Sequence, residues 1–283
     1  MTEIVPTWTA REGLPLKGKA SFGLLGILNI TPDSFYDGGI CTNAREYLKK
    51  AESLIHGGAD ILDLGAESTR PGANPVEPSI EQARLLPILA IIREKFPFVP
   101  ISVDTRNSLT ASHALARGAH IINDISGCCH DPAMPDVLAQ FKPGYILMHS
   151  QGNPQNMQIA PSYKNVIFEI MRFFEEKMNL LVKNGLPENR IALDPGIGFG
   201  KSLSHNIEIL RNIRAFKVFG RPVVAALSMK SIFGELFGHN LNERAIDTAV
   251  ASVLLKQKGI YWHRIHCVDQ VAKAFQLDEI LDS

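Results

Sequence analysis

Short apolar runs alternate with longer helical patterns along the chain. The runs are continuously apolar rather than alternating, which is typical of parallel strands buried on both faces of a sheet. We predict strands at Gly23–Leu28, Asp60–Leu64, Pro100–Val103, His120–Asn123, Gly144–Met148, Ile191–Leu193, Pro222–Leu227 and Trp262–Ile265. The helical patterns between them include Ala44–His56, Ile80–Lys95, Ser108–Arg117, Tyr163–Asn184, Ile207–Ala215 and Arg244–Lys258.

This order of elements predicts an α/β fold built as a (β/α)8 barrel, the TIM barrel, because eight strand–helix units fit into about 250 residues. An open doubly wound sheet usually carries GxGxxG after its first strand, and the sequence has no such fingerprint there. Residues 1–21 precede the first unit, and we predict that they form an N-terminal extension covering the bottom of the barrel. No change in composition divides the rest, so we predict one barrel domain over residues 22–283.

Polar residues stand at or just after the C-terminal end of each predicted strand. They are Asn29, Glu67, Ser68, Thr69, Arg70, Asp104, Asn123, Met148 with His149, Asp194, Ser228, Lys230, Ser231, Arg264 and His266. In a barrel these positions meet at one mouth, where such enzymes hold their active sites. Loops are polar in any protein, but this does not explain charges embedded in apolar sequence, such as Asp104 and Asp194.

These residues suit a flat ligand that forms hydrogen bonds and carries an anionic group. A carboxylate accepts two parallel N–H bonds, so Asp104, Asn123 and Asp194 suit a heterocycle rich in donors and acceptors. Arg264 and His266 lie two residues apart, which places their side chains on one side of a strand, where a phosphate or diphosphate could bind. The sequence has no GxSxG, HExxH or Walker motif. We therefore favour group transfer by stabilisation of a leaving group.

Lys230 lies beyond its strand, in a loop that leads into a helix. We interpret it as an electrostatic and hydrogen-bonding group, because a Schiff-base lysine is normally buried, which lowers its pKa. A phosphate-handling aldolase that uses Lys230 is a distant alternative, and borohydride trapping would reveal its adduct.

Charge and cysteine content exclude several classes of protein. The chain has 29 Lys plus Arg and 29 Asp plus Glu, so it lacks an overall basic field that would attract nucleic acid. It has neither a signal-peptide pattern nor an apolar stretch of about 18 residues. The four cysteines lack CxxC spacing. We expect a cytoplasmic protein with reduced thiols that binds small molecules, and no nucleic-acid or membrane partner.

Ordered motifs from Gly23 to about Phe275 resemble those of the dihydropteroate synthases, transferases of folate biosynthesis that sulfonamide drugs inhibit. The motifs are GILNITPDSFYDGG, GADILDLGAESTRPGA, ISVDTR, INDISG, ILMHSQGNPQNMQ, IALDPGIGFGK, LSMKS and RIH. The resemblance implies a pterin-binding TIM barrel that condenses 6-hydroxymethyl-7,8-dihydropterin diphosphate with 4-aminobenzoate, giving 7,8-dihydropteroate and diphosphate. It also implies a homodimer and a dissociative mechanism, in which the bond to diphosphate breaks before the amine attacks.

The resemblance also implies roles for individual residues. The expected pterin contacts are Asp104, Asn123, Asp194 and Lys230, with Met148 and Phe199 beside the ring. The expected diphosphate contacts are Thr69, Arg264 and His266, and Asn29 is the expected ligand of Mg²⁺. The expected 4-aminobenzoate contacts are Ser231, Phe35 and Pro71, with Arg70 as a further substrate-binding residue. The expected catalytic residues are Lys230, Arg264, His266 and Asp104, and the expected lid is the segment 31–37.

Two alternatives remain open at this point. A pterin-binding methyltransferase-type barrel would share the pterin carboxylates but would need neither TPDSF nor STRPG. A non-catalytic pterin-binding paralogue could lose Asn29, Arg264 or His266 without penalty, and all are present. The chain departs from the family pattern at Met229 and Cys267, where an Arg and an Asp are usual. We hypothesise that these changes removed both partners of an ion pair, since losing one alone would leave a buried charge.

Overall fold

The computed structural model describes residues 6–19, 21–30, 40–67, 75–152 and 157–282, with the backbone alone described for residues 40–43. Its strands are β1 (Gly23–Asn29), β2 (Ile61–Gly65), β3 (Ile101–Asp104), β4 (Ile121–Asp124), β5 (Gly144–Met148), β6 (Ile191–Asp194), β7 (Val224–Ala225) and β8 (Trp262–Ile265). They form one sheet of eight strands in the order β6-β5-β4-β3-β2-β1-β8-β7, and every pair is parallel. A parallel bridge between Leu193 and Val223 joins the two ends of this order. The predicted (β/α)8 barrel is therefore confirmed.

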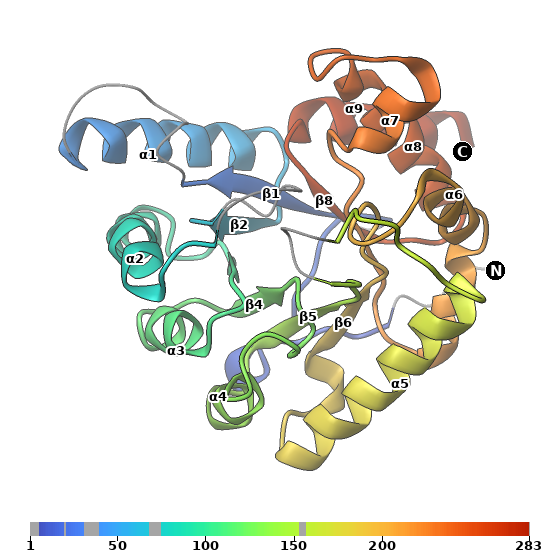
Figure 1. Ribbon diagram of the computed structural model, residues 1–283. Helices are drawn as coiled ribbons and strands as arrows, with labels where there is room; N and C mark the ends of the chain where they lie inside the picture. The colour runs from blue at the N-terminus through green and yellow to red at the C-terminus, as the bar shows by residue number, and fades with distance from the viewer. Residues whose placement is uncertain (1–5, 20, 31–39, 68–74, 153–156, 283) are drawn as a thin grey trace.

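Helices surround the strands (Figure 1). They are α1 (Ile40–His56), α2 (Pro78–Lys95), α3 (Ser108–Ala116), α4 (Met134–Phe141), α5 (Val166–Asn184), α6 (Leu203–Arg211), α7 (Ser231–Phe237), α8 (Arg244–Gln257) and α9 (Val268–Asp282). Short 3-10 helices occur at Arg11–Gly13, Glu188–Arg190 and Ile213–Phe219. None of the helices in the described ranges is long and apolar enough to cross a membrane.

Several predicted elements have different limits in the structure. The helix predicted at Ile207–Ala215 is wrong in its bounds: α6 covers Leu203–Arg211, and a 3-10 helix follows at Ile213–Phe219. Helix α1 begins at Ile40 rather than Ala44. Helix α5 begins at Val166 rather than Tyr163, because the side chain of Asn165 accepts a hydrogen bond from Phe168 N and caps the first turn. Strand β7 covers two residues instead of the predicted Pro222–Leu227. Pro222 has no N–H for the ladder, although its carbonyl still accepts a hydrogen bond from Leu193 N at 2.8 Å. After Ala225 the chain leaves the sheet and turns towards α7.

The N-terminal segment packs against the end of the barrel where the strands begin. The indole of Trp8 donates a hydrogen bond to Arg190 O, just before β6, and its ring stands edge-on to Trp262 at 5.3 Å. Trp8, Ala10 and Leu16 join an apolar cluster with residues from inside the barrel, including Leu25, Ile61, Ile121, Ile146, Ala192 and Val224. This packing closes the end of the barrel where the strands begin and leaves the opposite end for a site. The domain boundary between residues 21 and 22 stays a prediction.

Candidate active site

The register of the parallel strands brings the predicted residues level with one another at the carboxyl ends. Asn29 pairs with Gly65, Gly65 with Asp104, and Asp104 with Asn123. On the other side of the mouth, Met148 of β5 pairs with Asp194 of β6. Because all strands run in the same direction, these side chains come from one end of the barrel.

Arg264 of β8 bridges two buried carboxylates. Its Nε lies 2.6 Å from Asp63 Oδ2, and its Nη2 lies 2.6 Å from Asp104 Oδ2. The amide of Asn123 also donates to Asp63 Oδ2, at 3.3 Å. Asp63 was not among the predicted residues, although a carboxylate inside the apolar strand ILDLG was an available signal. The structure thus joins the expected pterin residue Asp104 directly to the expected diphosphate residue Arg264.

One guanidinium shared by two carboxylates leaves an excess of negative charge in a buried place. Burial raises the pKa of Asp104 to about 7, with Arg264 opposing this rise and Asp63 adding to it. Burial disfavours the charged form of Arg264, but Asp63 and Asp104 outweigh it and raise the pKa of the guanidinium above its usual value. Asp104 therefore binds a proton near neutral pH while Arg264 stays charged.

Lys230 and Asp194 form the second half of the charged cluster. Burial lowers the pKa of Lys230 to about 8, and the charge of Asp194 opposes this. The side chain of Lys230 lies against the β6–α6 loop, since a Cβ on Gly198 would be 3.5 Å from its Cδ. Its Nζ lies 4.1 Å from the centre of the Phe199 ring, a cation–π contact. Asp194 is 2% exposed, and its Oδ1 accepts a hydrogen bond from Gly196 N at 2.7 Å.

An apolar wall stands beside these charges. Met148 and Phe199 pack together with Ile125 and Met157 in a small cluster separate from the main core. The two residues expected beside the pterin ring therefore contact the same cluster, next to Lys230. A flat ring held between this wall and the carboxylates would be in contact with both.

His266 and Ser231 lie further out. The His266 side chain is exposed, and Ser228 Oγ accepts from His266 N at 2.9 Å and lies 3.0 Å from His266 Nδ1. Since the backbone N–H donates to this hydroxyl, the hydroxyl hydrogen is available for Nδ1. Ser231 is exposed at the first residue of α7.

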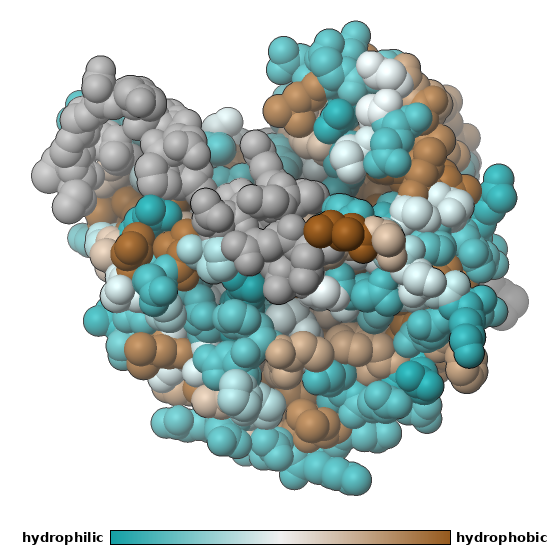
Figure 2. Space-filling view, viewed as in Figure 1, coloured by the Kyte–Doolittle hydropathy of each residue, from teal (hydrophilic) through white to brown (hydrophobic). Residues whose placement is uncertain are grey.

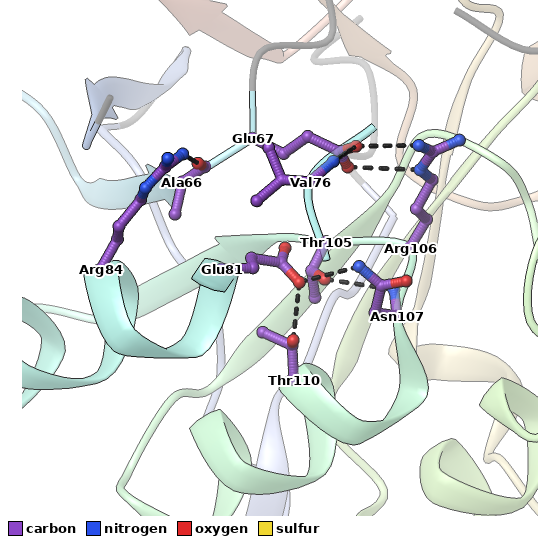
Figure 3. A network of polar contacts seen from close by, with 9 residues as sticks. All are labelled: Ala66, Glu67, Val76, Glu81, Arg84, Thr105, Arg106, Asn107 and Thr110. Carbon is purple, nitrogen blue, oxygen red and sulfur yellow. Dashed lines mark hydrogen bonds and ion pairs between the residues drawn. The ribbon is translucent and has the colours of Figure 1, made fainter. Parts of the chain in front are cut away.

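A second polar network supports the chain just after β3 (Figure 3). Arg106 donates two hydrogen bonds to the carboxylate of Glu67, of 3.2 Å from Nε and 2.8 Å from Nη2. The buried Glu81 of α2 accepts from Asn107 Nδ2 at 2.8 Å and from Thr110 Oγ1 at 2.6 Å. The contacts of Glu67 with Arg106 and of Glu81 with Asn107 both hold residues that closely follow Asp104, so they fix the end of β3.

Four predicted site residues, Phe35, Thr69, Arg70 and Pro71, lie outside the described residues, as does the predicted lid at 31–37. Asn29 is described at the end of β1. Gly65 lies between Asn29 and Asp104, and a Cβ there would lie 3.5 Å from Asp104 Cβ and 3.9 Å from Asn29 Oδ1. The missing side chain leaves space beside the Asn29 oxygen. In the described parts of the chain, no group of three or more His, Cys, Asp or Glu could hold a metal alone. Since Mg²⁺ often takes only one or two protein oxygens and completes its shell with water and substrate phosphates, Asn29 fits it.

Comparison with known proteins agrees with this geometry. Residues 25–266 match the family of pterin binding enzymes. The dihydropteroate synthase of Escherichia coli K12 is 38% identical over 256 residues, which cover 90% of each chain. The Yersinia pestis dihydropteroate synthase in a sulfonamide drug complex has a TM-score of 0.89 and 35% identity, covering 98% of this chain and 99% of that one. The Anaplasma phagocytophilum dihydropteroate synthase with bound 6-hydroxymethylpterin monophosphate has a TM-score of 0.83 and 34% identity, covering 93% of this chain and 100% of that one.

The fold, the carboxylate-rich mouth and the match over most of the chain define a pterin-binding barrel enzyme. Within that class, the chain belongs to the dihydropteroate synthase family, transferases of folate biosynthesis. The prediction from the motifs is thereby confirmed, and the synthase is favoured over a methyltransferase-type barrel or an aldolase.

Proposed function

We propose that the cluster of Asp63, Asp104, Asp194, Lys230 and Arg264 carries out the synthase reaction by binding a pterin diphosphate and stabilising its departing diphosphate. The single observation that carries this proposal is the contact of Arg264 with Asp104, since it joins a pterin-type carboxylate to an anion-binding cation. The substrate would then lie across Arg264, with its ring on one side and its diphosphate on the other.

The ring would bind through its N–H donors and acceptors. Asp104, Asn123 and Asp194 offer oxygens and an amide at the level of the strand ends. Met148 and Phe199 would contact a face of the ring, and Lys230 would donate to an acceptor at its edge. The bound pterin monophosphate of the Anaplasma phagocytophilum relative supports a ligand of this chemistry.

The reaction would place its largest demand on the leaving group. When the C–O bond to diphosphate breaks, negative charge grows on the departing oxygens, and cations aimed at that place lower the barrier. Arg264, His266 and Thr69 are the proposed partners of this charge. The cation left on the pterin methylene would be stabilised by Asp104 and Asp194. An aromatic amine is nucleophilic when neutral, so the second step needs no strong base.

Mg²⁺ held by Asn29 would neutralise part of the diphosphate charge. 4-Aminobenzoate would bind near Ser231, Phe35, Arg70 and Pro71. The Yersinia pestis relative forms a complex with a sulfonamide drug, and we propose that such a drug would compete with 4-aminobenzoate in this protein. Closing of the segment 31–37 would keep water from the reactive carbon.

We also propose that the protein forms a homodimer through the outer face of α8 and the helices beside it. The side chains of Ile246, Val250 and Leu254 are 74%, 55% and 55% exposed, and they follow each other at helical spacing of four residues. Figure 2 shows apolar surface over the lobe formed by α7, α8 and α9. Such a stripe favours burial against a second copy. We also propose that the protein is cytoplasmic.

The function is tested by incubating the chain with 6-hydroxymethyl-7,8-dihydropterin diphosphate, 4-aminobenzoate and Mg²⁺, and by measuring dihydropteroate and diphosphate. We expect equal amounts of both products from the wild type and none from D194A. Calorimetry should show that D194A has lost pterin diphosphate binding, because no other group takes over a buried carboxylate. Product formation by D194A at the wild-type rate would refute the assigned roles, and absence of product from the wild type would refute the activity.

A further inference from the structure

Lys201 is a buried lysine that the proposed reaction does not use. It is 2% exposed, and its Nζ lies 2.9 Å from Phe199 O, 3.0 Å from His149 Nδ1 and 3.2 Å from His149 O. An ammonium has three N–H donors, so three acceptors satisfy it completely, whereas a neutral amine would leave one acceptor without a donor. Burial lowers the pKa of Lys201 to about 7, opposed by Asp194 and assisted by Lys230. The three acceptors favour the charged form against this burial.

His149 is built to accept from this ammonium. Burial, and then the charge of Lys201, lower the pKa of His149 well below its usual value, so the ring is neutral. With Nδ1 facing the ammonium, the ring hydrogen is on Nε2. The backbone N–H of His149 donates to Asp194 O at 3.0 Å. Lys201 therefore contacts a residue that is itself hydrogen-bonded to the backbone carbonyl of Asp194, the expected pterin residue.

The loop between Asp194 and Lys201 fits closely against the end of β5. A Cβ on Gly196 would lie 1.9 Å from His149 O, and a Cβ on Gly200 would lie 2.2 Å from Gln151 O. Further along, Asn206 Oδ1 accepts from Gly198 N at 2.8 Å. The path of this loop is thus set by close backbone contacts, and the ammonium of Lys201 fastens it to β5.

The same loop carries groups that contact the site. Phe199, whose carbonyl is held by Lys201, places its ring 4.1 Å from Lys230 Nζ. The stem of Lys230 lies along Gly198, since a Cβ there would be 3.5 Å from Lys230 Cδ. At the start of the loop, Gly196 N donates to Asp194 Oδ1. A shift of the loop would move both the partner of Lys230 and the donor to Asp194.

We propose that Lys201 is a positioning residue, whose buried ammonium fastens the β6–α6 loop so that Phe199 and Asp194 hold Lys230 and the pterin in place. This inference rests on the proposed roles of Asp194 and Lys230. The charged groups that face Lys201 are Asp194 of β6 and Lys230, and the neutral ring of His149 lies beside it.

The test compares three variants in their affinity for pterin diphosphate, measured by calorimetry from about pH 6 to pH 10. K201M removes the charge and all three N–H donors at similar length. N206A removes an uncharged tie of the same loop. K258M is the matched control, since Lys258 Nζ also donates to two carbonyls, Leu210 O at 2.9 Å and Arg211 O at 3.2 Å, away from the site.

We expect K201M to weaken pterin binding about 10- to 100-fold, the loss typical of a misplaced site, and K258M to leave it unchanged. The KM for 4-aminobenzoate should stay constant, because its proposed partner Ser231 lies on α7 and not on this loop. Lys201 loses its charge as the pH rises through about 7. The wild type and N206A, which shares the looser loop but keeps the charge, should therefore lose pterin affinity over this range. K201M has no charge to lose there, so its affinity should fall less.

An equal fall of pterin affinity through about pH 7 in K201M and N206A would overturn the proposal, and so would equal losses for both substrates, which a purely structural lysine predicts. If K201M does not fold, K201Q keeps two donors without the charge and should show the same smaller fall. Failure of both to fold, while N206A and K258M fold, would make Lys201 a determinant of folding and also overturn the proposal. Binding is measured without turnover, so a wild type that binds pterin but makes no product would refute the proposed activity and leave this test intact.

Discussion

Replacing Asp63 tests the central cluster most directly. Asp63 is fully buried in β2, and its Oδ2 receives Arg264 Nε at 2.6 Å and Asn123 Nδ2 at 3.3 Å. Removing one partner of a buried ion pair costs about 3–5 kcal/mol, because the other charge stays buried. Arg264 keeps Asp104, and Asp63 Oδ1 has no hydrogen-bond partner among the described residues, so we expect the lower end for D63A. A loss of about 3 kcal/mol corresponds to a fall in Tm of roughly 6–12 °C for a chain of this size.

The assay is thermal and urea unfolding of the wild type and D63A, followed by tryptophan fluorescence, because Trp8 and Trp262 lie in contact at the closed end of the barrel. D269A is the control: Asp269 lies 3.8 Å from Lys273, but both side chains are mostly exposed, and exposed pairs contribute little. A Tm for D63A as close to the wild type as that of D269A would refute the view that Arg264 depends on both carboxylates.

Two further predictions concern the loop and the pH dependence. G196A should be far less stable than G220A. Both glycines have positive φ, 68° and 62°, but a Cβ added at Gly196 would lie 1.9 Å from His149 O, whereas one at Gly220 would meet no atom within 4 Å. Equal unfolding midpoints of the two variants would show that the loop moves aside freely. The pKa of Asp104 in the folded protein, about 7, lies above its ordinary value of 3.8, so its contribution to stability is complete below about pH 4 and is lost as the pH rises through about 7. D104N should therefore flatten the fall in Tm between about pH 4 and pH 7, and an unchanged slope would assign that proton to another group.

The sequence predicts the barrel well because chain direction and apolar runs determine most of it. Parallel strands of a barrel bring their carboxyl ends together, so Asp104, Asn123 and Asp194 could be assigned to one mouth before their distances were known. The shortened β7 shows the limit of this reasoning. The run from Pro222 to Leu227 is apolar throughout and all of it is buried, but only Val224 and Ala225 form the strand. Burial alone therefore does not show where the strand ends.

Asp63 and Lys201 could not be assigned from the sequence, because their roles depend on contacts between residues far apart in the chain. Asp63 and Arg264 are 201 residues apart, and their meeting depends on the register of β2, β1 and β8. Lys201 follows a glycine-rich loop, but its burial depends on how that loop lies against His149. The loss of an ion pair at Met229 and Cys267 stays a hypothesis for the same reason.

The free protein balances the charges of its site internally, and this links the two halves of the substrate. Arg264 contacts both Asp63 and Asp104, so a diphosphate that attracts Arg264 takes a cation from two buried carboxylates. Such a loss is costly unless other donors reach those carboxylates at once. A pterin ring has an N–H edge that can do this, while free diphosphate has none. We therefore expect the site to select a molecule that carries both groups. When the ring is absent, a proton on Asp104 would neutralise one of the two carboxylates instead.

The variant D63N tests this sharing of charge. With one carboxylate neutral, the pKa of Asp104 should fall, because the charge of Asp63 raises it. Carboxyl NMR would follow the titration of Asp104 in the wild type and in D63N. If the pKa of Asp104 does not fall in D63N, the two carboxylates do not share the charge of Arg264.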